Sequence, residues 1–310
     1  MSAEDSTKHI IQSLLVNLAI AASKGVAAVF TGSGAMLAET LHSFADCGNQ
    51  GLLLVGVKRS RKAPDKTHPL GYGREVYFWS FIVALMLFAG GGVFSIYEGI
   101  HKIHEPEPVE NVWVGLGILI FSLLMEGGAT LSNIKEINRR RGSKGFLQYL
   151  RDTKDSDLVV IFGENSAAVF GLVFAIGALG AASATGDGRF DGVGSLLIGI
   201  VLVLVAVFLA VEVKSLLVGE SADPDIEHAA REAAKGTDGF DAVLNVITVQ
   251  QGPGEVLVAI KVSVVPGMER DSICTAINDF EKKLRERCPQ AKWIFVEPDL
   301  VRQAARAPAA

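Results

Sequence analysis

The residues best suited to chemistry in this 310-residue chain lie within one long apolar stretch near its N-terminus. His42 and Asp46 are four positions apart, so a helix would place both side chains on one face, with Glu39 close to that face. An imidazole and a carboxylate at this spacing supply half of a tetrahedral metal site. The alternative is a hydrogen bond between helices with only a packing role. The pattern identifies a candidate metal-binding face.

A second carboxylate, Glu164, stands in another apolar stretch and is followed by Asn165 and Ser166. An ionisable group deep in a membrane costs about 3 kcal/mol or more unless it faces a polar cavity or binds a cation. Glu164 is therefore a further candidate ligand. If its helix begins as late as Leu158, the carboxylate would instead lie near the interface, where water can solvate it.

The composition indicates a membrane protein with a soluble part. The chain is 49% apolar and has a positive mean hydropathy although 20% of its residues are charged, so the charges must be segregated. A net charge of −5 and the lack of zinc-finger spacing argue against nucleic-acid binding. The isolated Cys47, Cys274 and Cys288 favour neither disulfides nor a thiolate site. The stretch from Met1 to Lys8 lacks the features of a signal peptide.

A bilayer core requires about 20 mostly apolar helical residues. Six stretches approach this length, and we expect them to form an all-α transmembrane bundle over residues 1–215: 10–30, 34–57, 76–100, 112–133, 158–182 and 193–213. Lys and Arg are concentrated in the second-to-third and fourth-to-fifth connections, which places these loops and both termini in the cytoplasm. The glycines at 90, 91 and 92 predict a close helix approach.

The composition becomes charged and alternating after Glu212. We expect a cytoplasmic α+β domain of ferredoxin-like, βαβ type over residues 216–300 and a disordered tail over 301–310. Its predicted elements are a helix at 225–235, strands at 243–249 and 256–264, a helix at 272–287 and a strand at 293–297.

The chain resembles the cation diffusion facilitator (CDF) family of metal-ion transporters over nearly its whole length. The resemblance rests on the stretches from His42 to Asp46, from Thr67 to Arg74 and from Leu217 to Glu220, in the family's order. The stretches 151–155 and 163–168 are similar to the branch that contains the ninth human zinc transporter.

The resemblance implies that His42, Asp46 and Glu164 bind one transported ion near mid-membrane. The family's fourth ligand position falls on Val160, which cannot coordinate. Water or one of three other side chains would complete the shell: Asn165, Ser43 and Glu39.

Two further family sites are altered. Asp65 and His68 match two ligands of a loop site, with Tyr72 in place of the third; they either bind metal weakly or only hydrogen-bond within the loop. In the C-terminal domain Leu244, Ile260 and Phe295 stand where the family has histidines, and only Glu297 keeps a carboxylate. We expect this domain to be a homodimerisation module without a metal pair, closed by apolar packing.

The residues and the resemblance together predict a divalent-cation exporter that exchanges metal for protons by alternating access. Zinc is the first expected ion, with Mn²⁺, Co²⁺ and Fe²⁺ as alternatives for a site of one imidazole and two carboxylates. No cofactor is expected, and no nucleotide-binding loop is present. The membrane is expected to be a bacterial inner membrane, or alternatively an organellar one.

Two other readings of the same residues remain. An intramembrane metalloenzyme is disfavoured because no HExxH pair occurs. A transport-inactive family member that only binds metal or partners is suggested by the ligands missing at Val160, Tyr72 and Phe295. Lys24 in the first stretch is expected to make a hydrogen bond between helices, and Glu126 in the fourth is expected to serve either a water-filled cavity or a neighbouring helix.

Overall fold

A computed structural model of the chain describes residues 3–153 and 156–300. The chain divides into two compact units, which we describe separately. The first contains the described residues up to Lys58, together with 77–151 and 156–214. The second contains 59–76, 152–153 and the residues from Ser215 onward. The predicted tail at 301–310 lies outside the described residues.

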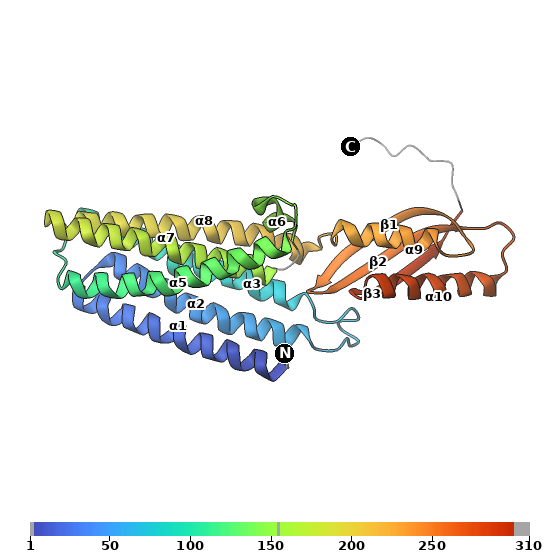
Figure 1. Ribbon diagram of the computed structural model, residues 1–310, viewed down its shortest axis with the longest axis horizontal. Helices are drawn as coiled ribbons and strands as arrows, with labels where there is room; N and C mark the ends of the chain where they lie inside the picture. Colours follow the sequence, from blue (N-terminus) through green and yellow to red (C-terminus); the bar gives the residue numbers. More distant parts are fainter. Residues whose placement is uncertain (1–2, 154–155, 301–310) are drawn as a thin grey trace. The chain divides into compact units, whose positions relative to one another are not determined.

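The first unit is helical (Figure 1). Its elements are α1 (Ala3–Thr31), α2 (Gly34–Ser60), α3 (Glu75–Met86), the π-helix η1 (Leu87–Val93), α4 (Phe94–His104), α5 (Val112–Arg140), the short α6 (Phe146–Asp152), α7 (Ser156–Thr185) and α8 (Arg189–Val218). Every predicted apolar stretch is helical, and each helix runs beyond its apolar part into charged residues. The helix α5 packs against both α7 and α1.

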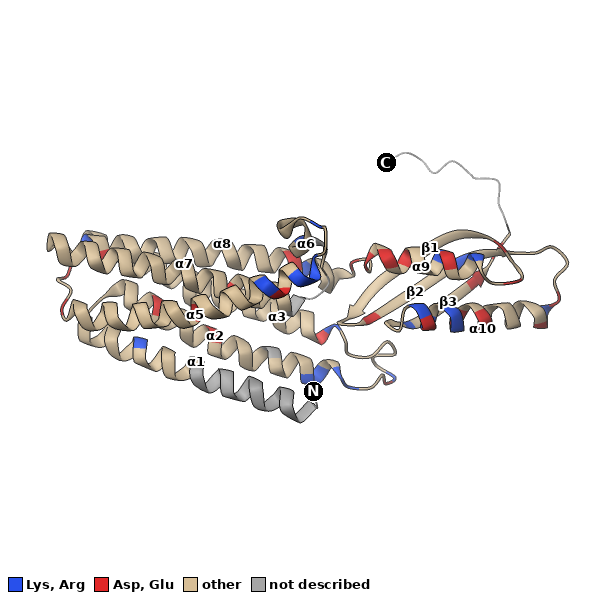
Figure 2. Cartoon of the chain, in the orientation of Figure 1, with Lys and Arg blue, Asp and Glu red and all other residues tan. Residues whose placement is uncertain are grey.

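Four helical segments in the described part of the chain are long and apolar enough to cross a membrane: Glu75–His104, Val112–Arg140, Leu158–Thr185 and Arg189–Val218. A shorter apolar segment, Asn17–Thr31, lies in α1. The helix α2 is equally long but carries a polar face, which lowers its hydropathy. Figure 2 shows that charged side chains are sparse along these helices and frequent at their ends and in the second unit.

Glycines bring α4 and α8 into backbone contact. A Cβ added at Gly99 would lie 2.5 Å from the backbone nitrogen of Leu196, and one at Gly199 would lie 2.7 Å from that of Ile96. Two of the three glycines predicted to allow close helix approach, Gly91 and Gly92, also lie against α8, where they contact side chains. The prediction was wrong for Gly90, around which nothing lies within 4 Å.

The second unit contains an α+β domain. Its elements are α9 (Pro224–Lys235), β1 (Phe240–Gly252), β2 (Glu255–Val264), α10 (Arg270–Arg287) and β3 (Ala291–Pro298). The sheet order is β1-β2-β3, with β1 antiparallel and β3 parallel to β2. The helices α9 and α10 cover one sheet face over a core that includes Ile226, Val258 and Phe280. The order of elements predicted from the sequence is confirmed.

The other sheet face carries an apolar row across all three strands. Ile247 pairs with Ala259, and Ala259 pairs with Phe295. Ile247 and Phe295 are 54% and 55% exposed. Half-exposed large apolar side chains in register on one face are typical of an interaction surface.

Candidate functional site

One face of α2 gathers polar side chains inside the helical unit. Glu39, His42 and Asn49 are fully buried, Ser43 is nearly so, and the Asp46 side chain is 19% exposed. The positions 39, 42, 43, 46 and 49 follow helical spacing, so the five side chains share one side of the helix. A buried stripe of this kind needs polar partners from neighbouring helices.

His42 and Asp46 are brought together as predicted. The His42 Nδ1 and Asp46 Oδ1 atoms are 3.6 Å apart, which is too long for a normal hydrogen bond. Among the described residues, neither ring nitrogen of His42 nor Oδ1 of Asp46 has a hydrogen-bond partner. Buried polar atoms rarely lack a hydrogen-bond partner. Their lone pairs are therefore available to a cation.

Glu164 reaches the same region from α7. Its carboxylate is 5% exposed, and its Oε1 accepts a 2.7 Å hydrogen bond from Asn49 Nδ2. The sequence did not single out Asn49; its position three residues after Asp46, on the polar face of α2, was the signal that could have identified it.

Lys24 from α1 holds a second buried cluster. Its ammonium group donates to Ser43 Oγ (2.8 Å), Glu39 Oε2 (3.2 Å) and Glu126 Oε1 (2.8 Å), so it links α1, α2 and α5. The expected contacts of Lys24 and Glu126 between helices are confirmed. Glu39 packs directly against Gly171 of α7, where a Cβ would collide with its Oε1.

The candidate ligands therefore meet as pairs rather than as a complete cage. In residues 3–153 and 156–300, no three His, Cys, Asp or Glu side chains are grouped closely enough to hold a metal ion. His42 lies beside Asp46 on α2, and Glu164 of α7 is hydrogen-bonded to Asn49 of α2. Val160 is fully buried one helical turn before Glu164 and offers no donor atom. Asn165 is half-buried beside it.

The candidate loop site has a different character. Asp65 Oδ1 accepts from Thr67 Oγ1 (2.6 Å) and from the backbone nitrogens of Thr67 and His68, and its Oδ2 accepts from Tyr72 Oη (2.7 Å) and Lys62 Nζ (3.1 Å). These bonds, led by that of Thr67, hold the pKa of Asp65 well below its usual range. The rings of His68 and Tyr72 are in tilted contact, with centroids 4.2 Å apart and an interplanar angle of 33°. The geometry favours the loop-bonding alternative for this pair.

The altered positions of the α+β domain have structural roles. Ile260 is 2% exposed within the core, whereas Phe295 lies on the open sheet face. Glu297 pairs with Lys261 at 3.0 Å, so its carboxylate already has a cation. Leu244 is half-buried in β1.

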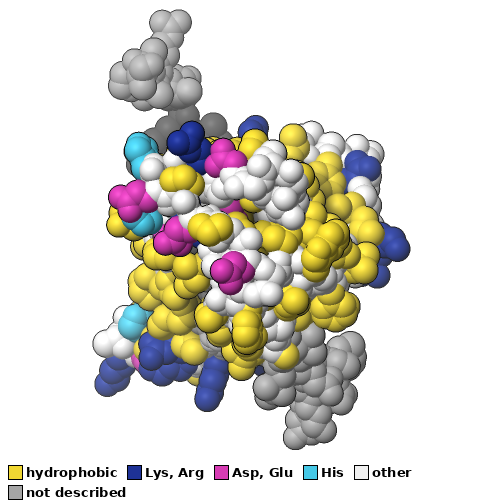
Figure 3. Space-filling view, turned by 90° about the vertical axis from the view of Figure 1, so that its left-hand side faces the viewer, with side chains coloured by type: hydrophobic (Ala, Val, Ile, Leu, Met, Phe, Trp, Pro, Cys, Tyr) yellow, Lys and Arg dark blue, Asp and Glu magenta, His cyan; other side chains and the backbone are white. Residues whose placement is uncertain are grey.

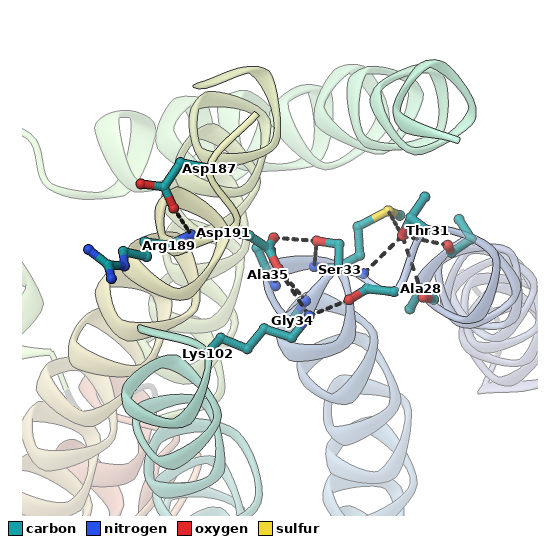
Figure 4. A network of polar contacts seen from close by, with 12 residues as sticks. Ala28, Thr31, Ser33, Gly34, Ala35, Lys102, Asp187, Arg189 and Asp191 are labelled. Atoms are coloured by element: carbon teal, nitrogen blue, oxygen red, sulfur yellow. Dashed lines mark hydrogen bonds and ion pairs between the residues drawn. The ribbon is translucent and has the colours of Figure 1, made fainter. Parts of the chain in front are cut away.

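A third polar cluster ties three parts of the helical unit near the α1–α2 turn (Figure 4). Asp191 of α8 is fully buried and accepts from Ser33 Oγ (2.5 Å), the Gly34 nitrogen (2.6 Å) and Lys102 Nζ of α4 (3.3 Å). Lys102 also donates to the carbonyl of Gly32. The carboxylate thus caps the N-terminus of α2, where the helix dipole and free backbone N–H groups favour a negative charge.

Figure 3 views one end of the molecule, where apolar side chains predominate and acidic and histidine side chains group toward one side. Long apolar helices that bury an imidazole, several carboxylates and a lysine define an integral membrane protein. Residues 10–218 match the model of the cation efflux transmembrane domain. The chain therefore belongs to the cation efflux family, which is a family of transporters.

Named relatives agree with this assignment. The chain is similar to the Proton-coupled zinc antiporter SLC30A9, mitochondrial, of Xenopus laevis, with 35% identity over 251 residues that cover 80% of this chain and 45% of that protein. The human protein of the same name is 33% identical over 235 residues, covering 75% of this chain and 41% of its own length. Metal tolerance protein C4 of Arabidopsis thaliana is 31% identical over 224 residues, with 72% and 49% covered. The chain spans less than half the length of these relatives.

Proposed function

We propose that this chain exports a divalent metal cation in exchange for protons, with His42, Asp46 and Glu164 as ligands. The observation that carries the proposal is the pair His42 and Asp46, whose buried nitrogen and oxygen atoms lack hydrogen-bond partners among the described residues. Inside a membrane such a pair is costly unless it binds a cation. The names of the vertebrate relatives, proton-coupled zinc antiporters, support the same activity.

The proposed architecture has six transmembrane helices, formed by α1, α2, the continuous α3-η1-α4 segment, α5, α7 and α8. The helix α2 crosses despite its polar face because that face is directed into the unit, toward Lys24 and Glu164. The concentration of Lys and Arg in alternate loops supports a topology with both termini in the cytoplasm. A bacterial inner membrane is the proposed location, with an organellar membrane as the alternative.

The ligands couple metal to protons directly. Neutral imidazole and ionised carboxylates bind a metal ion, whereas their protonated forms do not. An ion entering from the cytoplasm binds, the helices reorient, and protons from the far side displace it. One imidazole and two carboxylates suit zinc and also tolerate Mn²⁺, Co²⁺ and Fe²⁺.

A homodimer through the α+β domain is the proposed assembly. The row formed by Ile247, Ala259 and Phe295 offers an apolar surface that a second copy can cover with its own row. Phe295 replaces a family histidine in this row, which supports apolar packing rather than a metal pair as the closing contact.

Zinc uptake into proteoliposomes that contain a zinc-sensitive dye tests the proposal. Wild type should show flux that depends on a pH gradient, and Asp46→Ala should abolish it. Parallel assays with Mn²⁺, Co²⁺ and Fe²⁺ identify the ion. Equal flux in both proteins would overturn the site, and no flux with any ion would favour the transport-inactive alternative.

A further inference from the structure

The proposed site lacks one ligand. Three ligands leave a tetrahedral ion with an open position, and the side chain at the family's fourth position, Val160, is buried and apolar. The four alternatives expected from the sequence were water, Glu39, Ser43 and Asn165. The structure gives physical grounds to separate them.

Two of these candidates are already engaged. Lys24 is fully buried, and its three ammonium protons are donated to Glu39, Ser43 and Glu126. Moving Ser43 Oγ or Glu39 Oε2 onto a metal ion would leave the buried ammonium group short of an acceptor. The other oxygen of Glu39, Oε1, has no hydrogen-bond partner among the described residues, but it lies against Gly171, about 10 Å along α7 from Glu164.

Asn165 is also poorly placed. It directly follows Glu164 on α7, so the two side chains leave the helix about 100° apart. Adjacent side chains on a helix do not face each other, so Glu164 and Asn165 are poorly placed to bind one ion together. The carbonyl of Asn165 accepts from Thr130 Oγ1 (3.3 Å), which places this residue on the side of α7 that meets α5.

Asn49 meets the requirements that the other three side chains do not. It is fully buried, it lies on the polar face of α2 one turn after Asp46, and its Nδ2 bonds to Glu164 Oε1 at 2.7 Å. Within the described part of the chain its Oδ1 has no hydrogen-bond partner. An amide oxygen can coordinate a divalent ion, although it cannot be ionised.

We propose that the Asn49 amide oxygen is the fourth ligand of the transported ion. The proposal rests on the proposed function. Glu164 has two oxygens, so one can bind the ion while the other keeps its hydrogen bond from Asn49 Nδ2. A single side chain thus supplies one ligand and orients another. The resulting donor set contains one nitrogen and three oxygens, which extends the site's tolerance toward hard divalent ions such as Mn²⁺.

Binding of Co²⁺ and Zn²⁺ to the purified full-length protein in detergent tests this inference. Two variants separate ligation from positioning: Asn49→Leu removes the oxygen and the N–H group, whereas Asn49→Asp keeps an oxygen and removes the N–H. Asn133→Leu, which removes an amide from α5, is the matched control. Size-exclusion chromatography of each variant checks that it is folded.

We expect Asn49→Leu to weaken Zn²⁺ binding at least about tenfold. Mutation of a residue that only hydrogen-bonds to a metal ligand already weakens metal binding by about 10- to 100-fold. Its visible Co²⁺ spectrum should change as water replaces the amide oxygen. Asn49→Asp should retain wild-type Zn²⁺ affinity or exceed it and keep an intense four-coordinate Co²⁺ spectrum, and Asn133→Leu should match wild type.

Two results would overturn the inference. Equal loss in Asn49→Asp and Asn49→Leu would make Asn49 only a positioning residue for Glu164, and an unchanged Co²⁺ spectrum in Asn49→Leu would remove it from the coordination shell. Asp46→Ala, measured in the same series, keeps the two proposals distinguishable. If Asp46→Ala also binds normally, the whole transport site is wrong; if only the Asn49 variants bind normally, the site stands without this ligand.

Discussion

Lys24 pairs with two carboxylates inside the helical unit, those of Glu39 and Glu126. It is fully buried, as is Glu39, and it also contacts Glu126, whose side chain is 19% exposed. One ammonium group thus serves two carboxylates on two other helices. Such a cluster is sensitive to the loss of a single partner, because the remaining charges stay buried without compensation.

We therefore predict that Lys24→Met destabilises the protein by about 3–5 kcal/mol, the range for breaking a buried ion pair. Thermal unfolding in detergent measures this effect. Lys135→Met, at an exposed lysine of α5, should change stability by less than about 0.5 kcal/mol. Adding Glu39→Gln to Lys24→Met should recover part of the loss. Equal unfolding temperatures for the two lysine variants would contradict the role given to Lys24.

Asp65 leads to a prediction about pH. Because its folded pKa is depressed, its contribution to loop order is present above its unfolded pKa of about 4 and is lost as the pH falls through the lower folded value. The backbone amides of Thr67 and His68, which donate to Asp65, should stay protected from hydrogen exchange from pH 7 down to about 4.

In the variant Asp65→Asn these amides should exchange faster at pH 7, without a further pH-dependent loss of protection at low pH beyond the intrinsic exchange rate. Hydrogen–deuterium exchange with mass spectrometry measures both proteins. Protection unchanged by the substitution would mean that the loop is held by its other contacts.

At the scale of the elements, Asp191 shows how a helix end is stabilised inside the unit. Its carboxylate caps α2 and pairs with Lys102, so removing it leaves the Gly34 nitrogen without this acceptor and the Lys102 ammonium group without its counter-charge. Asp187, two residues after α7 ends at Thr185, offers a contrast: it accepts a 3.0 Å hydrogen bond from the Arg189 nitrogen at the start of α8.

We predict that Asp191→Ala costs about 3–5 kcal/mol, whereas Asp187→Ala costs about 1 kcal/mol, as for an ordinary helix cap. Parallel thermal unfolding of the two variants measures the difference. Similar small losses for both would show that Lys102 finds another acceptor. A double variant, Asp191→Ala with Lys102→Met, should be less damaging than the sum of the single changes.

The helices could be predicted from sequence, but their partners could not. The lengths of the apolar stretches predicted the six helical segments. In the structure the helices continue into the charged residues that follow, as α5 does up to Arg140. The pair His42 and Asp46 is local and follows from spacing. The bond between Asn49 and Glu164 joins residues 115 positions apart, and no periodicity reports such a contact. Gly90 was misjudged because periodicity does not show which side of η1 meets α8.

At the scale of the whole molecule, the α+β domain carries the surface that we propose for dimerisation. Its helices cover one sheet face, while the row of Ile247, Ala259 and Phe295 lies on the other. Burying a large apolar side chain contributes about 1.5–3 kcal/mol. Two copies of Phe295 would therefore contribute substantially to a symmetric dimer.

We predict that Phe295→Glu weakens dimerisation of the full-length protein in detergent at least about tenfold, because a buried carboxylate would replace apolar contact. Leu300→Glu is the matched control, since Leu300 is 80% exposed and lies after β3, outside the row. Analytical ultracentrifugation measures both. Dissociation by neither variant would place the dimer contact elsewhere.

The cap on α2 has a mechanical consequence. Asp191 and Lys102 fix the end of α2 at Gly34, and α2 has 27 residues, so it extends about 40 Å from that point. A rigid helix that is held at one end tilts about that end. Any tilt of α2 would displace its Lys58 end most, while Asp46, near the middle, would travel about half as far. A tilt about the capped end would therefore move the proposed ligands His42 and Asp46 less than it moves the Lys58 end.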